Sequence, residues 1–229
     1  MNNKIEAVVE AYEKYIDKNV NAYDTPETPG LYLDKHEGDP VIINKYRSFV
    51  GKITFFTTKL SPKTGSATRT LSGHMSSPDP LHWKLMDRLI GYLKVMKQKG
   101  ILYVKPEFLK TAFLAHTDYG NCKGARRIVG FSFITIVGCI FDYWMAKYHS
   151  VSDSSCESEY KELEKCAEGE LLLQMMLGEF NLDDLPGVTG EDNHGAIFLS
   201  KNKQESEHTK HNDLKYHFIR KLTDNRYGV

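Results

Sequence analysis

The sequence has 229 residues and a mass of 26.2 kDa, which is enough for one large domain or two small ones. Apolar residues make up 41% of it and charged residues 26%, a composition that can bury a core. Lysine plus arginine and aspartate plus glutamate both total 30, so the net charge is zero. This excludes a protein that binds nucleic acid or an anionic membrane by bulk charge alone. No apolar run approaches the roughly 18 residues of a spanning helix, and we expect no membrane partner.

The first hundred residues favour helices. Residues 3–18 predict an amphipathic helix, because their apolar residues recur on one face. Residues 21–40 are rich in proline, glycine and aspartate, which is typical of a loop. A second helix is predicted over residues 76–99, since the SPDP segment can cap it and leucine recurs every four residues from Leu81 to Leu93.

A basic stretch lies between these two helices. Residues 41–78 contain no aspartate or glutamate but carry six basic residues: Lys45, Arg47, Lys52, Lys59, Lys63 and Arg69. Such a stretch in a neutral protein can contact phosphates and release counterions from a nucleic-acid backbone. The alternative is a solvated surface that acidic neighbours balance in the fold. We expect Lys45, Arg47 and Lys52 to bind nucleic acid.

After Lys110 the apolar pattern changes to period two and to residues that favour strands. The predicted elements are strands within 111–120, 127–138 and 139–149, a helix over 154–177, a strand over 187–191, and helices beginning in 192–202 and 208–222. The order β-β-β-α-β-α-α predicts an α/β fold with a mixed sheet and flanking helices, preceded by a mostly helical segment. We divide the chain near residue 105.

Three carboxylates fall at the ends of these elements. Asp118 ends the first strand, Glu159 lies in the first turns of the long helix, and Asp192 follows the fourth strand. In such a sheet the first and fourth strands can be neighbours with the helix packed over them, so the three side chains can converge. Converging acids need a cation, and oxygen ligands suit Mg²⁺ or Mn²⁺. The alternative is that these residues are helix caps and strand ends without a ligand.

Six segments follow one another in an order that is specific as a set: NKYRSFVGKITFF, LSGHMSSPDPLHWKLMDRLIGYLK, HTDYGN, SSCESEY, EDNHGA and HTKHNDLKYHFIR. Together they resemble the end of a copia-type LTR retrotransposon Pol polyprotein, from about Val41 to Arg220. The matching part of that polyprotein is the tail of the reverse transcriptase followed by its RNase H domain. The resemblance implies an RNase H-like mixed sheet over 106–229, and a remnant of the thumb- or connection-like end of the reverse transcriptase over 1–105.

The function that the resemblance implies is hydrolysis of the RNA strand of RNA–DNA hybrids by two-metal catalysis. Asp118, Glu159 and Asp192 would be the catalytic residues and the ligands of Mg²⁺ or Mn²⁺. Glu159 is chosen over Glu157 because it holds the Ala-Glu-Tyr position of the wider RNase H pattern. Expected partners are the hybrid and the rest of the Pol polyprotein, in a cytoplasmic virus-like particle or in the nucleus. The Tyr-x-Asp-Asp motif of a polymerase does not occur, so we expect no polymerase activity.

The family continues with a fifth strand and a helix that carries a fourth acid. We therefore expect a domain truncated before these elements, and the alternative function is a truncated or domesticated, non-catalytic nucleic-acid-binding module. Lys210 and Lys215 lie in a histidine-containing segment that we expect to contact phosphates, not to bind zinc. His116 stands two residues before Asp118, and we expect a packed strand residue there in preference to a general base.

Overall fold

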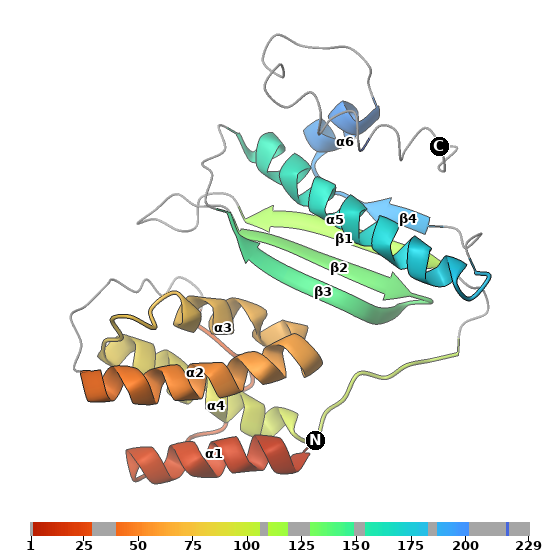
Figure 1. Cartoon of the computed structure of the whole chain (residues 1–229). Helices are drawn as coiled ribbons and strands as arrows, with labels where there is room; N and C mark the ends of the chain where they lie inside the picture. The colour runs from red at the N-terminus through yellow and green to blue at the C-terminus, as the bar shows by residue number, and fades with distance from the viewer. Residues whose placement is uncertain are drawn as a thin grey trace. The chain divides into compact units, whose positions relative to one another are not determined.

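A computed structural model of the chain describes residues 2–28, 40–105, 110–118, 129–148, 154–182, 187–201 and 219 (Figure 1). The chain divides into two compact units, Met1–Leu102 and Tyr103–Val229. The first unit is helical and the second contains a mixed sheet with helices. The predicted fold class is therefore confirmed. Among the described helices, none has the length and apolar content that crossing a bilayer requires.

Four helices form the first unit: α1 (Asn2–Ile16), α2 (Pro40–Leu60), α3 (Gly65–Ser72) and α4 (Pro80–Met96). The two helices predicted at 3–18 and 76–99 are α1 and α4, whereas α2 and α3 occupy the basic stretch, for which we predicted no element. Apolar side chains of all four helices share one core. In α4 the predicted leucine face is buried except at its start, where Leu81 is 40% exposed.

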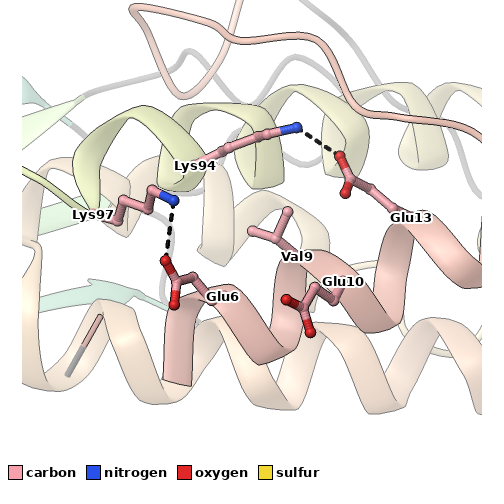
Figure 2. Close-up of a pocket in the computed structure, with 6 residues that line it drawn as sticks. All are labelled: Glu6, Val9, Glu10, Glu13, Lys94 and Lys97. Atoms are coloured by element: carbon pink, nitrogen blue, oxygen red, sulfur yellow. Dashed lines mark hydrogen bonds and ion pairs between the residues drawn. The ribbon is translucent and has the colours of Figure 1, made fainter. Parts of the chain in front are cut away.

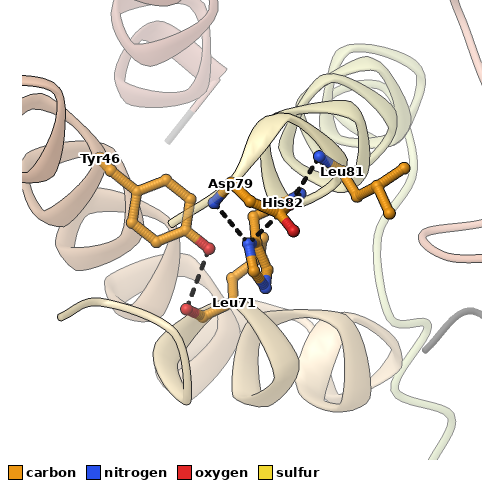
Figure 3. A network of polar contacts seen from close by, with 5 residues as sticks. All are labelled: Tyr46, Leu71, Asp79, Leu81 and His82. Carbon is orange, nitrogen blue, oxygen red and sulfur yellow. Dashed lines mark hydrogen bonds and ion pairs between the residues drawn. The ribbon is translucent and has the colours of Figure 1, made fainter. Parts of the chain in front are cut away.

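The start of α4 shows why the segment SPDPLHW begins a helix (Figure 3). Asp79 is the N-cap, and its Oδ1 accepts hydrogen bonds from the backbone N–H groups of Leu81 (2.7 Å) and His82 (3.0 Å). In return, the Asp79 N–H donates to Nδ1 of His82 at 2.7 Å, which completes a capping box. Because Nδ1 accepts, the buried imidazole is neutral with its proton on Nε2. Beside it, the hydroxyl of Tyr46 donates to the carbonyl oxygen of Leu71 at 3.0 Å.

The sheet of the second unit has the strand order β3-β2-β1-β4. Its strands are β1 (Thr111–Asp118), β2 (Val129–Ile136), β3 (Cys139–Lys147) and β4 (Gly187–Gly190). The first three pair antiparallel in chain order, and β4 pairs parallel to β1. A two-residue turn joins β2 to β3, and both of its residues, Val137 and Gly138, have positive φ, as this type of hairpin demands.

Helix α5 (Ser155–Gly178) lies across one face of the sheet (Figure 1). It begins at Ser154, whose hydroxyl accepts a hydrogen bond from the Glu157 N–H at 3.1 Å. Helix α6 (His194–Lys201) follows β4. Apolar residues of the sheet, α5 and α6 form the core of this unit, together with Ile219. The rest of the helix predicted at 208–222 lies outside the described residues.

Candidate metal centre

The second half of β1 forms an open edge of the sheet in the part of the chain that the structure describes. Strand β4 pairs with β1 from Thr111↔Gly187 to Leu114↔Gly190 and ends there. Because the two strands are parallel, the chain that leaves β4 continues along the same edge. Continuing this register by two residues puts Asp192 level with His116. The neighbourhood of the first and fourth strands is therefore as predicted, and it brings Asp192 to β1.

His116, Glu159 and Asp192 converge at this edge from three different elements. His116 Nδ1 lies 3.6 Å from Glu159 Oε1 and 3.5 Å from Asp192 Oδ1. One ligand atom from each residue lies within 4.8 Å of the others. The structure thus brings together two of the three predicted carboxylates. The expectation that His116 is a packed strand residue is wrong, because its side chain is 59% exposed and faces both acids.

Asp118 is the last residue of β1, and its backbone is in register with Val129 of β2. Its side chain lies outside what the structure describes. The convergence of Asp118 with Glu159 and Asp192 therefore stays a prediction.

Glu159 is the buried member of the cluster, with 5% of its surface exposed. Burial raises the pKa of its carboxyl group, and nearby Asp192 acts in the same direction, whereas Thr117 as a hydrogen-bond donor and the nearby His116 oppose this rise. Its Oε2 atom is buried and makes no hydrogen bond of good geometry with a described residue, although Thr117 of β1 is a donor next to this carboxylate. A buried carboxylate oxygen without a well-aligned donor is costly, and a divalent cation would satisfy it. The donor set of the cluster therefore fits a bound metal ion.

Glu157 and Glu159 have different surroundings in the structure. Glu157 lies in the first turn of α5, where a negative charge interacts favourably with the helix dipole. Its Oε1 pairs with Lys161 Nζ at 2.7 Å. Glu157 thus already has a cationic partner on its own helix, while Glu159 points to the end of β1.

Sequence reasoning missed Glu191, the residue before Asp192. Burial raises the pKa of Glu191 to about 7, and the carboxylates of Glu159 and Asp192 add to this rise. Its Oε1 accepts a hydrogen bond from the Asn193 N–H at 2.9 Å, and its buried Oε2 has no partner among the residues described. The signal in the sequence was the pair of consecutive acids that follows the fourth strand. The predicted residues therefore have a further carboxyl group beside them.

A further carboxylate, Glu162, lies one turn after Glu159 on the face of α5 that packs on the sheet. Glu162 is fully buried. It accepts hydrogen bonds from the hydroxyl of Tyr148 at 2.6 Å and from the hydroxyl of Ser132 on β2. Burial raises the pKa of Glu162. Because its oxygens already have donors, Glu162 joins α5 to the sheet and does not offer a second metal site.

The predicted nucleic-acid-binding residues of the basic stretch lie on two sides of α2. Lys45, Arg47 and Lys52 are all exposed. At about 100° per residue, Lys45 and Lys52 share one side of the helix, and Arg47 lies on the other flank. There, Arg47 Nε donates to the carbonyl oxygen of Met75 at 2.8 Å. The remaining predicted contacts, Lys210 and Lys215, lie outside the described residues.

A groove between α1 and α4 is lined by Glu6, Val9, Glu10, Glu13, Lys94 and Lys97 (Figure 2). Lys94 Nζ pairs with Glu13 Oε1 at 2.8 Å, and Lys97 Nζ pairs with Glu6 Oε1 at 3.1 Å. Both lysines are therefore engaged across the helix interface. The two ion pairs link α1 to α4, so we interpret these charged residues as structural and not as a candidate functional site.

Comparisons with known proteins give relatives of one main kind. No family model matches the chain. An alignment of 228 residues covers 96% of the chain and relates it to the retrovirus-related Pol polyprotein from transposon TNT 1-94 of Nicotiana tabacum. The two sequences are 25% identical in this alignment. Over 203 residues the chain is 28% identical to the corresponding polyprotein from transposon RE2 of Arabidopsis thaliana. The chain spans 17% and 14% of the lengths of these two relatives.

Two further similarities were found. Over 124 residues, 54% of the chain and 87% of the relative, the chain is 27% identical to the secreted RxLR effector protein 161 of Plasmopara viticola. A solved structure of the foamy viral protease-reverse transcriptase in complex with double-stranded DNA matches 86% of the chain, with a TM-score of 0.49 and 8% identity. The match covers 32% of that viral chain. The homologues that match most of this chain are copia-type Pol polyproteins of plant transposons.

Proposed function

We propose that the second unit is an RNase H-like nuclease that hydrolyses the RNA strand of an RNA–DNA hybrid. The observation that carries this proposal is the convergence of Glu159 and Asp192 near the end of β1, whose last residue is Asp118. The relation to Pol polyproteins supports the choice of substrate, because copying RNA into DNA produces such a hybrid. The 2′-hydroxyl groups of the RNA strand would distinguish it from DNA.

In this proposal, Asp118, Glu159 and Asp192 hold Mg²⁺ or Mn²⁺. Such ions, when bound, polarise a phosphoryl oxygen and lower the pKa of water. The buried Glu159 is fixed by its position on α5, whereas the side chain of Asp192 is 73% exposed and is accessible to a phosphodiester. Because β4 ends beside Leu114, no described strand covers this edge, and a nucleic-acid backbone can approach it.

The test is cleavage of end-labelled RNA in a hybrid by the full chain, with Mg²⁺ or Mn²⁺ as the added ion. Asp118→Asn and Asp192→Asn should each reduce the cleavage rate by at least about 100-fold, because each removes a charged ligand. Asp142→Asn is the matched control, since Asp142 is an exposed aspartate of β3 outside the cluster. Cleavage that survives EDTA, or that survives both substitutions, would contradict the proposal.

The same experiment decides between the nuclease and the non-catalytic alternative. A chain that binds the hybrid with a salt-dependent affinity but leaves the RNA intact in both metals would be a nucleic-acid-binding module. Primer extension on the same hybrid should be absent in either case, because the Tyr-x-Asp-Asp motif of a polymerase palm does not occur in the sequence.

A further inference from the structure

The cluster at the end of β1 offers one donor that an all-carboxylate metal site lacks. His116 Nδ1 lies 3.6 Å from the buried Glu159 Oε1 and 3.5 Å from Asp192 Oδ1. Two ligands that are each about 2.0–2.2 Å from one ion lie about 3–3.5 Å apart, so these separations need only a small adjustment to close around a cation. The imidazole is thus placed as a ligand would be.

A second observation also indicates a ligand here. Glu159 is more than nine-tenths buried, its Oε1 faces His116, and its Oε2 makes no hydrogen bond of good geometry with a described residue, although Thr117 lies next to it. The carboxyl groups of Asp192 and Glu191 lie close by. An imidazole that is 59% exposed and the neighbouring Thr117 stabilise this buried carboxylate less than a divalent cation would.

We propose that His116 is a metal ligand together with Glu159 and Asp192, and that this nitrogen donor makes the site prefer a first-row transition-metal ion over Mg²⁺. Imidazole nitrogen binds transition metals well, whereas Mg²⁺ demands oxygen ligands and gives up its water reluctantly. This inference rests on the proposed function, since it concerns the same site. It does not require that the site cleave anything.

The experiment uses the full chain with Mn²⁺ alone, and no nucleic acid. Mn²⁺ also binds oxygen-only sites, so the nitrogen donor is tested by nitrogen coupling and by the change on substitution of His116. Pulsed electron paramagnetic resonance detects the coupling of bound Mn²⁺ to a ligand nitrogen. Equilibrium dialysis gives the dissociation constants of Mn²⁺ and of Mg²⁺ for each variant.

The variant is His116→Gln, which an exposed position accommodates. The matched control is His194→Gln, because His194 is an exposed histidine two residues after Asp192 and outside the cluster. We expect nitrogen coupling in the unsubstituted chain and in His194→Gln, and its loss in His116→Gln. In His116→Gln the affinity for Mn²⁺ should fall by roughly tenfold or more, while the affinity for Mg²⁺ changes by less than about threefold.

Bound Mn²⁺ without nitrogen coupling, or with coupling that survives His116→Gln, would overturn the inference and would show that His116 only pairs with the acids. Nitrogen-coupled Mn²⁺ in a chain that cleaves no hybrid would uphold the inference and contradict the nuclease proposal. Metal-dependent cleavage by a chain whose bound Mn²⁺ shows no nitrogen coupling would uphold the nuclease proposal and contradict the inference about His116. The two proposals can therefore fail separately.

Discussion

Gly130 of β2 and Glu162 of α5 are matched in shape, because the carboxylate of Glu162 occupies the space that a Cβ at position 130 would fill. The hydroxyls of Ser132 and Tyr148 donate to the same carboxylate. This contact lets α5 pack closely on the sheet. It also places Glu159, one turn earlier on the helix, at the end of β1.

The fit of Gly130 predicts that Gly130→Ala destabilises the second unit. The added Cβ must displace a buried, hydrogen-bonded carboxylate, and such overpacking costs about 1–3 kcal/mol. Calorimetric unfolding of the full chain measures the loss. The control is Gly51→Ala in α2, where nothing lies within 4 Å of the added atom and a helical alanine should stabilise by about 0.5–1 kcal/mol. Equal transition temperatures for Gly130→Ala and the unsubstituted chain would show that Glu162 moves aside freely.

Glu159→Gln should stabilise the metal-free chain and remove its stabilisation by a metal ion. Without metal at pH 7 the variant should be the more stable protein, because a neutral amide avoids the desolvation cost that raises the pKa of Glu159. Mn²⁺ should raise the melting temperature of the unsubstituted chain and leave that of the variant almost unchanged. Thermal unfolding in EDTA and in Mn²⁺ measures both effects.

Glu168→Gln is the control for that experiment. Glu168 lies on the same helix but is exposed, and its Oε2 pairs with Lys165 Nζ at 2.6 Å. It should keep the full stabilisation by Mn²⁺. A Glu159→Gln variant that is stabilised by Mn²⁺ as strongly as this control would remove Glu159 from the site.

The capping histidine predicts a pH dependence of the first unit. Burial, with a smaller contribution from His74, lowers the pKa of His82 from its ordinary value of 6.5 to about 4. As the pH falls from about 6.5 to 4, the unfolded chain therefore binds a proton that the folded unit does not. The free energy of unfolding should fall across this window by at most about 1.4 kcal/mol per pH unit, and this contribution should be constant above it.

His82→Gln should flatten this pH dependence, because glutamine also accepts the N-cap hydrogen bond of a capping box but does not titrate. Urea unfolding at several pH values between 4 and 8 measures the slope. His194→Gln, at an exposed site, should leave the slope as it is. An identical slope in His82→Gln would assign the dependence to other groups.

The two sides of α2 predict unequal effects on hybrid binding. Lys45→Glu combined with Lys52→Glu changes two exposed charges on one side and should reduce the magnitude of the log–log salt slope by about one to two. Arg47→Gln should change it less, since Arg47 lies on the other flank and donates to the Met75 carbonyl oxygen. Fluorescence anisotropy with a labelled hybrid at several salt concentrations measures both. Equal salt slopes in the unsubstituted chain, the double variant and Arg47→Gln would show that the basic stretch of residues 41–78 is ordinary solvated surface.

Local periodicity determined most of the elements. Strands β1 to β3 follow from the alternation of β-forming residues after Lys110, and α4 follows from its leucines and its Asp79 cap. Helix α2 was missed because its run of β-branched and aromatic residues, from Ile53 to Thr58, favours strands locally. Packing of one face of α2 into the shared core overrides that preference.

The sequence by itself also placed Glu159 and Asp192 at the ends of their elements, where carboxylates can meet. It could not place His116, since strand alternation does not say which neighbours a side chain meets. Only the register of β4 decides this: the strand ends beside Leu114 and leaves the end of β1 open, so Asp192 reaches His116 from the same edge. The burial of Glu159, and with it the desolvation of a carboxylate that a cation would stabilise, likewise depends on how closely α5 packs on the sheet.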